Sequence, residues 1–197
     1  MPEPGRRFVL GVTGAVGAGK STVCRALLQH GFAVLDVDDV AAEALGEMLP
    51  ELARLVPAAV SDAGTLIKGP LFAAMLQDAG LRKELEERLR PFIVRRIRAW
   101  AESLRGPGAL DAALLFESGL DAFCDATLCV ECDRAERQRR VQQRTTASAQ
   151  HFDALESAQL PADEKRRRAS VSISTHGRAA QLEEKLQAVL AALPPLR

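Results

Sequence analysis

Residues 14–21 read Gly-Ala-Val-Gly-Ala-Gly-Lys-Ser and fit the pattern G-x-x-x-x-G-K-[ST]. In such a segment the glycines let the backbone bend closely around an anion, and successive N–H groups point toward it. The lysine reaches the β- and γ-phosphates of a nucleotide, and the last hydroxyl suits one position on Mg²⁺. Ser21 is therefore a candidate metal ligand. The expected nucleotide contacts are consecutive: Gly14, Ala15, Val16, Gly17, Ala18, Gly19, Lys20, Ser21 and Thr22.

A second group of candidate residues is acidic and follows the apolar run Ala33–Leu35. We expect a strand over residues 33–39 that ends in Asp36, Asp38 and Asp39. In open parallel sheets ligands bind beyond the carboxyl ends of the strands, beside the loop that follows the first strand. Asp38 is thus a candidate base or metal-shell carboxylate. The alternative is that the three acids only end a strand and cap a helix, and the pattern does not separate them.

The elements that must hold these residues alternate between strand and helix. Residues 8–13, 33–39, 109–117, 126–130 and 171–174 have strand character, and helical patterns follow the first strand at 22–30 and the fourth at 133–144. Such alternation predicts an α/β fold with a five-stranded parallel sheet flanked by helices. We expect one domain over residues 1–197, with its core at about 6–39, 108–133 and 170–195.

Residues 40–105 differ in pattern from this core. Their short helical stretches are broken by proline and glycine up to Gly80, which predicts a helical substrate cap. From Leu81 to Leu104 apolar residues recur at helical spacing, and Pro91 either kinks this helix or starts a new one at Arg90.

The segment from Arg134 to Arg168 concentrates positive charge, with nine Arg or Lys against five Asp or Glu. It could bind nucleic acid, form a solvated face, or act as a mobile lid whose guanidiniums neutralise phosphates. Beside a phosphate-binding loop we favour a lid at about 140–165. Without interleaved aromatic residues, Lys165 and the three arginines that follow it are expected to be solvated surface.

The whole chain of 197 residues is electrically balanced, with 26 Lys and Arg against 26 Asp and Glu. This composition gives no general attraction to nucleic acid or to an anionic membrane. No apolar run approaches the roughly 18 residues of a membrane helix, and the first ten residues lack a hydrophobic stretch of secretory-signal length. We expect a cytoplasmic protein, monomeric or a small homo-oligomer, that binds neither nucleic acid nor membrane.

The four cysteines are expected to be reduced thiols rather than a disulfide framework. Cys129 and Cys132 have the spacing of a metal pair, but no second pair or suitably spaced histidine completes a tetrahedral set. We therefore expect these two cysteines to be packed structural residues rather than metal ligands.

Several motifs resemble the dephospho-CoA kinase family, over nearly the whole chain. The family's T-G-x-x-G-x-G-K-[ST] stands at residues 13–21, and its V-[IL]-D-x-D at residues 34–38. Its L-L-[FL]-E-x-x-L with a following Cys-Asp stands at residues 114–120 and 124–125. A glutamine with two later arginines is present as Gln138, Arg140 and Arg144. The family's Q-x-x-x-x-E-K matches Gln159 with Glu164 and Lys165.

The resemblance implies a P-loop NTPase fold and a kinase that uses ATP and Mg²⁺ to phosphorylate the ribose 3′-hydroxyl of dephospho-CoA. It implies that Asp38 is the base, that Lys20 and Ser21 contact phosphate and magnesium, and that Asp111 is a further magnesium-shell candidate. Arg140 and Arg144 would be lid residues near the transferred phosphate.

The sequence departs from the family's pattern on the substrate side. The departing residues are Ala42, Lys68, Arg90, Ser170 and Thr175. A kinase for another small nucleotide or nucleoside, and a nucleotide-dependent switch without an acceptor, remain alternatives. The acid-tipped second strand argues against the switch, because a switch needs no base for a hydroxyl.

Overall fold

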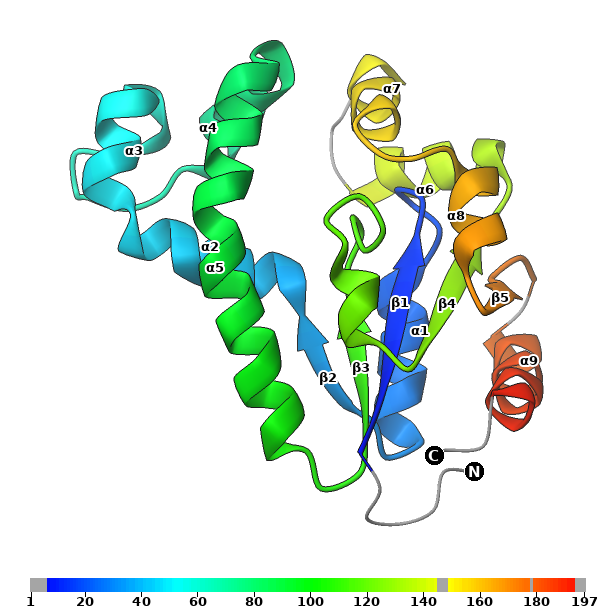
Figure 1. Cartoon of the computed structure of the whole chain (residues 1–197). Helices are drawn as coiled ribbons and strands as arrows, with labels where there is room; N and C mark the ends of the chain where they lie inside the picture. Colours follow the sequence, from blue (N-terminus) through cyan, green and yellow to red (C-terminus); the bar gives the residue numbers. More distant parts are fainter. Residues whose placement is uncertain (1–6, 145–148, 178, 194–197) are drawn as a thin grey trace. The chain divides into compact units, whose positions relative to one another are not determined.

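The computed structural model of the protein describes residues 7–144, 149–177 and 179–193 (Figure 1). The chain divides into two compact units. The larger consists of Met1–Asp36 with Trp100–Arg197, and the smaller of Val37–Ala99. Among the described residues, no helix combines the length and apolar character needed to cross a membrane.

The larger unit is built on a five-stranded parallel sheet with the order β2-β3-β1-β4-β5. Its strands are β1 (Phe8–Gly14), β2 (Ala33–Asp36), β3 (Pro107–Asp111), β4 (Ala126–Glu131) and β5 (Val171–Ser174). The predicted fold class is confirmed. Because β1 lies between β3 and β4, its carboxyl end is at the position where the strand order changes direction, which is where open α/β sheets bind ligands.

The two faces of β1 pack against different elements, as the alternation of side chains in a strand requires. Phe8, Leu10 and Val12 join a core with α1 (Lys20–Gln29) and α9 (Ala179–Ala192). On the other face a Cβ added to Gly11 would lie 2.7 Å from the Cys124 Sγ atom. Glycine is needed there because the segment after η2 (Leu120–Phe123) approaches the strand so closely.

Between β4 and β5 the described residues form α6 (Arg134–Arg144), α7 (Ala149–Ser157) and α8 (Ala162–Arg168). α6 contacts α7, and α8 packs against β1 and β4. The predicted lid, about 140–165, covers the end of α6, α7 and the start of α8. Residues 145–148 of that prediction lie outside the described residues.

Two predicted strands end earlier than expected. β2 stops at Asp36, and Asp38 and Asp39 belong to the first turn of α2 (Val37–Glu47), where acidic side chains interact favourably with the helix dipole. β3 stops at Asp111, and Glu117 lies in turns rather than at a strand end. The apolar residues Leu115 and Phe116 are buried from those turns, which explains why the run resembles a strand in the sequence.

The smaller unit contains α2, α3 (Leu49–Leu55), η1 (Pro57–Ala59), α4 (Lys68–Gln77) and most of α5 (Ala79–Ser103). Its own core includes Leu52, Leu71 and Leu85. α5 continues through Pro91, so the alternative of a new helix at Arg90 is wrong. Of the departures from the family pattern, Ala42, Lys68 and Arg90 lie in this unit.

Candidate active site

The phosphate-binding loop lies between β1 and α1, as the sequence predicts. Gly17 and Gly19 have φ angles of 78° and 96°, in the left-handed region that suits glycine. The N–H of Ala18 donates to the Ala15 carbonyl at 3.0 Å, which closes a turn within the loop. In the described part of the chain, no group accepts the N–H groups of Gly17, Gly19 or Ser21. The loop and the first turn of α1 thus present unsatisfied donors to an anion.

Lys20 and Asp111 form an ion pair beside this loop. The Lys20 ammonium donates to Asp111 Oδ1, and the two side chains are 19% and 7% exposed. Asp111 is the last residue of β3, so the sheet brings this carboxylate to the loop that follows the neighbouring strand β1. Burial, together with the nearby Asp111 carboxylate, raises the pKa of the Cys24 thiol well above its ordinary value. Cys24 is therefore a neutral thiol, and Lys20 carries the positive charge of this part of the site.

Helix α6 lies directly against the loop. A Cβ added to Gly17 would lie 2.6 Å from the Arg137 carbonyl oxygen. The Arg137 guanidinium is buried, donates to the Val16 carbonyl at 3.2 Å and pairs with Glu156 at 2.6 Å. It also lies 5.6 Å from the centre of the Phe152 ring. Arg137 therefore connects the phosphate-binding loop to α7.

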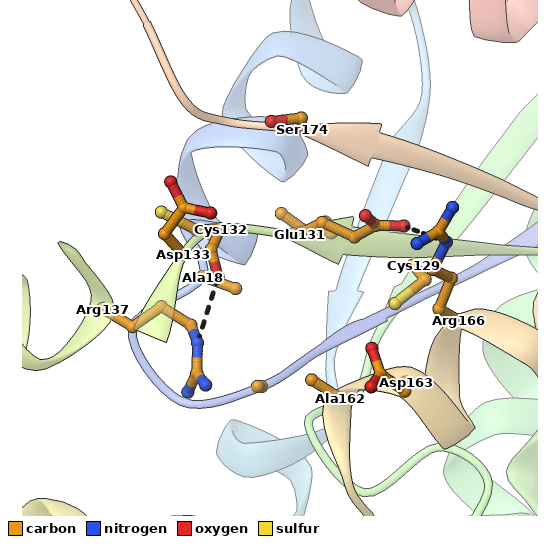
Figure 2. A pocket seen from close by; sticks show the side chains of 12 residues that line it. Ala18, Cys129, Glu131, Cys132, Asp133, Arg137, Ala162, Asp163, Arg166 and Ser174 are labelled. Carbon is orange, nitrogen blue, oxygen red and sulfur yellow. Dashed lines mark hydrogen bonds and ion pairs between the residues drawn. The ribbon is translucent and has the colours of Figure 1, made fainter. Parts of the chain in front are cut away.

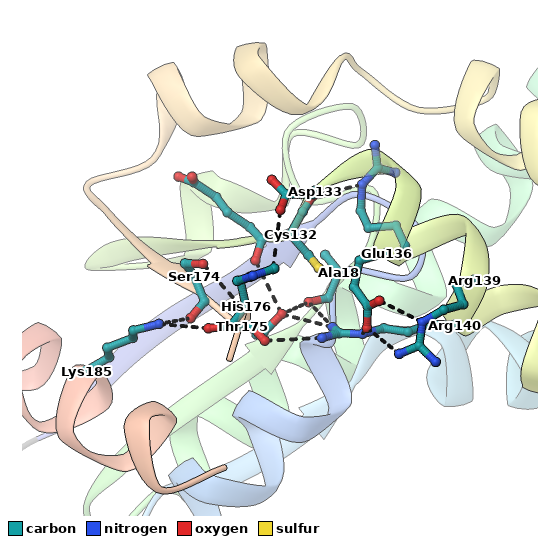
Figure 3. Close-up of polar contacts among 12 residues, drawn as sticks. Ala18, Cys132, Asp133, Glu136, Arg139, Arg140, Ser174, Thr175, His176 and Lys185 are labelled. Carbon is teal, nitrogen blue, oxygen red and sulfur yellow. Dashed lines mark hydrogen bonds and ion pairs between the residues drawn. The ribbon is translucent and has the colours of Figure 1, made fainter. Parts of the chain in front are cut away.

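Arg140 lies on the same helix and contacts the segment that follows β5 (Figure 3). Its guanidinium donates to Thr175 Oγ1 at 3.0 Å and to the Thr175 carbonyl at 3.1 Å, and the Thr175 hydroxyl donates to the Ala18 carbonyl at 2.6 Å. Hydrogen bonds from Arg139 and Arg140 hold the pKa of Glu136 at about 2. Arg140 is thus a fixed cation beside the loop. The side chain of Arg144 lies outside the described residues.

A cavity of about 220 Å³ adjoins the loop at the carboxyl end of β4 (Figure 2). Ala15 and Ala18 line it from the loop, and Arg166 of α8 pairs with Glu131 at 3.4 Å in its wall. Burial raises the pKa of Cys129, another lining residue, to about 11, so that its sulfur is a packed thiol. The lining carries both signs of charge and has no single anionic or cationic character.

Most of the predicted site residues lie together in the larger unit. They are the loop residues Gly14 to Thr22, Asp111 and Arg140. Asp38 belongs to the smaller unit, in the first turn of α2, and is exposed. Its role as a base stays a prediction.

Sequence reasoning was wrong about Lys165 and attached no function to Gln159. Lys165 is buried, with 0% of its side chain exposed, whereas Arg166, Arg167 and Arg168 are exposed as expected. Gln159 Oε1 accepts the Val16 N–H of the phosphate-binding loop at 3.0 Å. The only sequence signal for both residues is the spacing Gln159, Glu164, Lys165.

The parallel sheet, the glycine loop and a lysine paired with a carboxylate at the sheet's carboxyl edge define a P-loop kinase fold. Solved structures agree. One from Thermus thermophilus has a TM-score of 0.85 and 36% identity, and covers 96% of this chain and 99% of its own. Shikimate kinase from Acinetobacter baumannii has a TM-score of 0.59 at 18% identity, over 95% and 96% of the two chains, which shows the shared fold alone.

Sequence comparison narrows this class to one family. The family model described as dephospho-CoA kinase matches residues 8–181. The dephospho-CoA kinase of Thermus thermophilus is 38% identical over 94% of this chain and 92% of its own length. The dephospho-CoA kinase of Campylobacter jejuni shares the fold, with a TM-score of 0.64 and 20% identity over 93% and 95% of the two chains. The chain belongs to the dephospho-CoA kinase family. The expected family and kinase class are confirmed.

Proposed function

We propose that this protein transfers the γ-phosphate of ATP to the ribose 3′-hydroxyl of dephospho-CoA, giving CoA and ADP. The observation that carries the proposal is the Lys20–Asp111 pair beside a loop of unsatisfied N–H donors, in a chain of the dephospho-CoA kinase family. Phosphoryl transfer requires little covalent chemistry from the protein itself. It needs alignment of the acceptor oxygen with the γ-phosphate and neutralisation of the developing charge.

The nucleotide phosphates bind at the loop in this proposal. The N–H groups of Gly17, Gly19 and Ser21 donate to phosphate oxygens, and the positive end of the α1 dipole favours the same anion. Lys20 shifts its ammonium from Asp111 to the β- and γ-phosphates. This exchange gives the Lys20 ammonium an anionic partner both before and after ATP binds. It also releases the Asp111 carboxylate for another cation.

The residues beside the phosphate-binding loop fit a magnesium ion that accompanies ATP. Among the described residues no group of three His, Cys, Asp or Glu side chains forms a ready-made metal cage. Magnesium is usually held by one or two protein oxygens together with substrate phosphates and water. The exposed Ser21 hydroxyl and the Asp111 carboxylate form such a set. Magnesium would neutralise charge on the phosphate oxygens.

Asp38 is the proposed general base that accepts the proton of the 3′-hydroxyl. It is a carboxylate two residues after the end of β2, and the resemblance to the family assigns it this role. Arg140 and Arg144 are the proposed lid cations, with Arg140 already fixed at the loop by Thr175. A cytoplasmic location and a monomeric or small homo-oligomeric state belong to the same proposal.

Release of ADP with different acceptors tests the proposal. With ATP and magnesium, dephospho-CoA should give one CoA for each ADP, whereas adenosine and AMP should react poorly. If another nucleoside raises ADP release and dephospho-CoA does not, the protein is a different small-molecule kinase. If no acceptor raises ADP release above the acceptor-free rate, the protein is a nucleotide-dependent switch.

Substitution of Asp38 tests the base. Asp38→Asn keeps the size of the side chain and removes its basicity, so ATP and dephospho-CoA should bind nearly as in the parent. We expect kcat to fall by about two to four orders of magnitude, which is the contribution of a positioned general base. Asp39→Asn is the matched control, because Asp39 is exposed in the same helical turn, and it should cost far less. Equal losses in the two variants would remove the role from Asp38.

A further inference from the structure

One hydrogen bond of the phosphate-binding loop leads to the segment that joins α7 to α8. The Val16 N–H donates to Gln159 Oε1 at 3.0 Å, across 143 residues of sequence. Gln159 lies just beyond the end of α7, at Ser157, and just before α8, which begins at Ala162. A loop amide that would otherwise be available to an anion is therefore bound by a neutral side chain.

Contacts of the residues that follow Gln159 hold it in this position. The N–H of the next residue, Leu160, donates to Glu117 Oε1 at 2.8 Å. The same oxygen lies 2.8 Å from the Lys165 ammonium, which also donates to the Ala113 carbonyl. Lys165 is 0% exposed, and a buried ammonium persists only where partners compensate for its lost hydration. The segment from Gln159 to Lys165 is thus attached to the turns after β3 as well as to the phosphate-binding loop.

This segment lies on the Lys20 side of the loop. Burial lowers the pKa of the Lys165 ammonium, Glu117 opposes that change, and the positive charge of Lys20 lowers it further. Geometry agrees, because the Ala113 carbonyl that accepts from Lys165 lies two residues after Asp111, the partner of Lys20. The Ala113 carbonyl that Lys165 contacts also accepts the Thr13 hydroxyl at 3.3 Å, one residue before the loop begins. In the proposed function Lys20 binds the β- and γ-phosphates, so the Gln159 segment borders the γ-phosphate end of the nucleotide.

The chemistry of a carboxamide suits this border. A glutamine side chain has one acceptor oxygen and an NH₂ group with two donors. The oxygen of Gln159 is bound to the loop, and across the described residues nothing accepts from its Nε2. An NH₂ group fixed in this way can donate to an anionic oxygen without reorganising. A carboxylate in its place would present only acceptors and repel phosphate.

We propose that Gln159 donates a hydrogen bond from Nε2 to the γ-phosphate of ATP while its oxygen holds the Val16 N–H. The contact forms with ATP and is lost with ADP, so the segment between α7 and α8 distinguishes the two nucleotides. The inference rests on the proposed function in taking ATP as the phosphoryl donor. The rival explanation is that Gln159 only bridges the loop to α8.

Two substitutions of Gln159 separate these explanations. Gln159→Glu keeps an acceptor for the Val16 N–H but replaces the donor with negative charge. Gln159→Ala removes both functions. Gln187→Ala is the control, because Gln187 is an exposed glutamine of α9. The measurements are equilibrium affinities for ADP and for a non-hydrolysable ATP analogue, each with magnesium, followed by kcat and the thermal midpoint of each variant.

If Gln159 contacts the γ-phosphate, Gln159→Ala weakens the ATP analogue by roughly 10-fold or more, the range of a hydrogen bond to a charged group, and leaves ADP within about twofold. Gln159→Glu must then be worse than Gln159→Ala for the analogue while its thermal midpoint stays near that of the parent. If Gln159 only bridges the loop to α8, Gln159→Glu should bind the ATP analogue more tightly than Gln159→Ala does. The glutamate would keep the bond to the Val16 N–H, so its affinity for the analogue would match that of the parent.

Either of two results overturns the inference. One is equal weakening of the ATP analogue and ADP in both variants, and the other is parent-like analogue binding by Gln159→Glu. The nucleotide affinities need no acceptor. If dephospho-CoA is not phosphorylated by the parent, the proposed function fails while the ratio of ATP-analogue to ADP affinity still reports on Gln159.

Discussion

Replacing Lys20 with methionine should disable the protein in two separable ways. Lys20→Met keeps the aliphatic stem and removes the ammonium that is proposed to follow the β- and γ-phosphates into the transition state. Loss of one such preorganised contact typically removes about 3–4 kcal/mol of transition-state stabilisation. At about 1.4 kcal/mol for each factor of ten, kcat/KM should fall roughly 100- to 1000-fold.

The same substitution should destabilise the fold. Asp111 is 7% exposed and would lose the ammonium that neutralises it, while Lys20 is 19% exposed and leaves some access to water. Removing one partner of a buried ion pair costs about 3–5 kcal/mol, and the partial exposure of Lys20 favours the lower end. Asp111→Asn in the Lys20→Met background removes the isolated charge. The double variant should therefore recover most of the free energy of unfolding without recovering kcat/KM.

A double-mutant cycle tests both effects, with the parent, the two single variants and the double variant. Denaturant unfolding measures the free energy of unfolding of each protein, and ADP release measures its kcat/KM. Asp111→Asn alone removes both the partner of Lys20 and the proposed metal-shell carboxylate. If Lys20→Met stays within about twofold of the parent in kcat/KM, the Lys20 ammonium does not stabilise the transition state as proposed. If the double variant is no more stable than Lys20→Met, the lost stability does not come from a buried Asp111 carboxylate without its partner.

Three further outcomes are expected. ATP with dephospho-CoA should slow amide exchange in α6, α7 and α8, and unchanged exchange would mean that these helices do not act as a lid. Burial lowers the pKa of Lys165 below its ordinary value of 10.5, so between these two values the unfolded chain binds more protons than the folded one. The free energy of unfolding of the parent relative to Lys165→Met should therefore rise as the pH rises toward 10.5, and a flat difference would contradict the lowered pKa. Cys129, with its pKa raised to about 11, should react slowly with thiol reagents near neutral pH and faster as the pH rises, and rapid reaction of the native protein at neutral pH would show that it is not packed.

The sequence predicts the features whose signals are local. The phosphate-binding loop depends on glycines, a lysine and a serine within eight positions, and the run Val171–Ser174 alternates with the period of the strand that it forms. Five parallel strands follow from the alternation of such runs with helical patterns. Each of these signals lies within one element and needs no knowledge of its neighbours.

The structure differs from the sequence prediction where tertiary contacts determine the conformation or burial of a residue. Leu115 is as apolar as a strand residue but is buried from a turn, so a pattern of hydrophobicity cannot show that β3 ends at Asp111. Lys165 stands in a run of four basic residues, and only the packing of α8 against the sheet selects it for burial beside Glu117. The bond between Gln159 and Val16 joins residues 143 positions apart. No spacing within one segment encodes that contact.

The division of the chain into two units bears on which part of it can change without altering the sheet. All strand pairings of the described sheet lie within the larger unit, including β2 with β3 on the side where the chain leaves for Val37. The chain re-enters at Trp100, whose ring approaches Gly108 of β3 so closely that an added Cβ would lie 2.7 Å from it. The smaller unit is therefore a continuous insert with its own core, and the chain leaves and re-enters the larger unit beside β3. Because every strand pairing of the described sheet lies within the larger unit, a change confined to Val37–Ala99 leaves the hydrogen-bonded ladders on both sides of β1 in place.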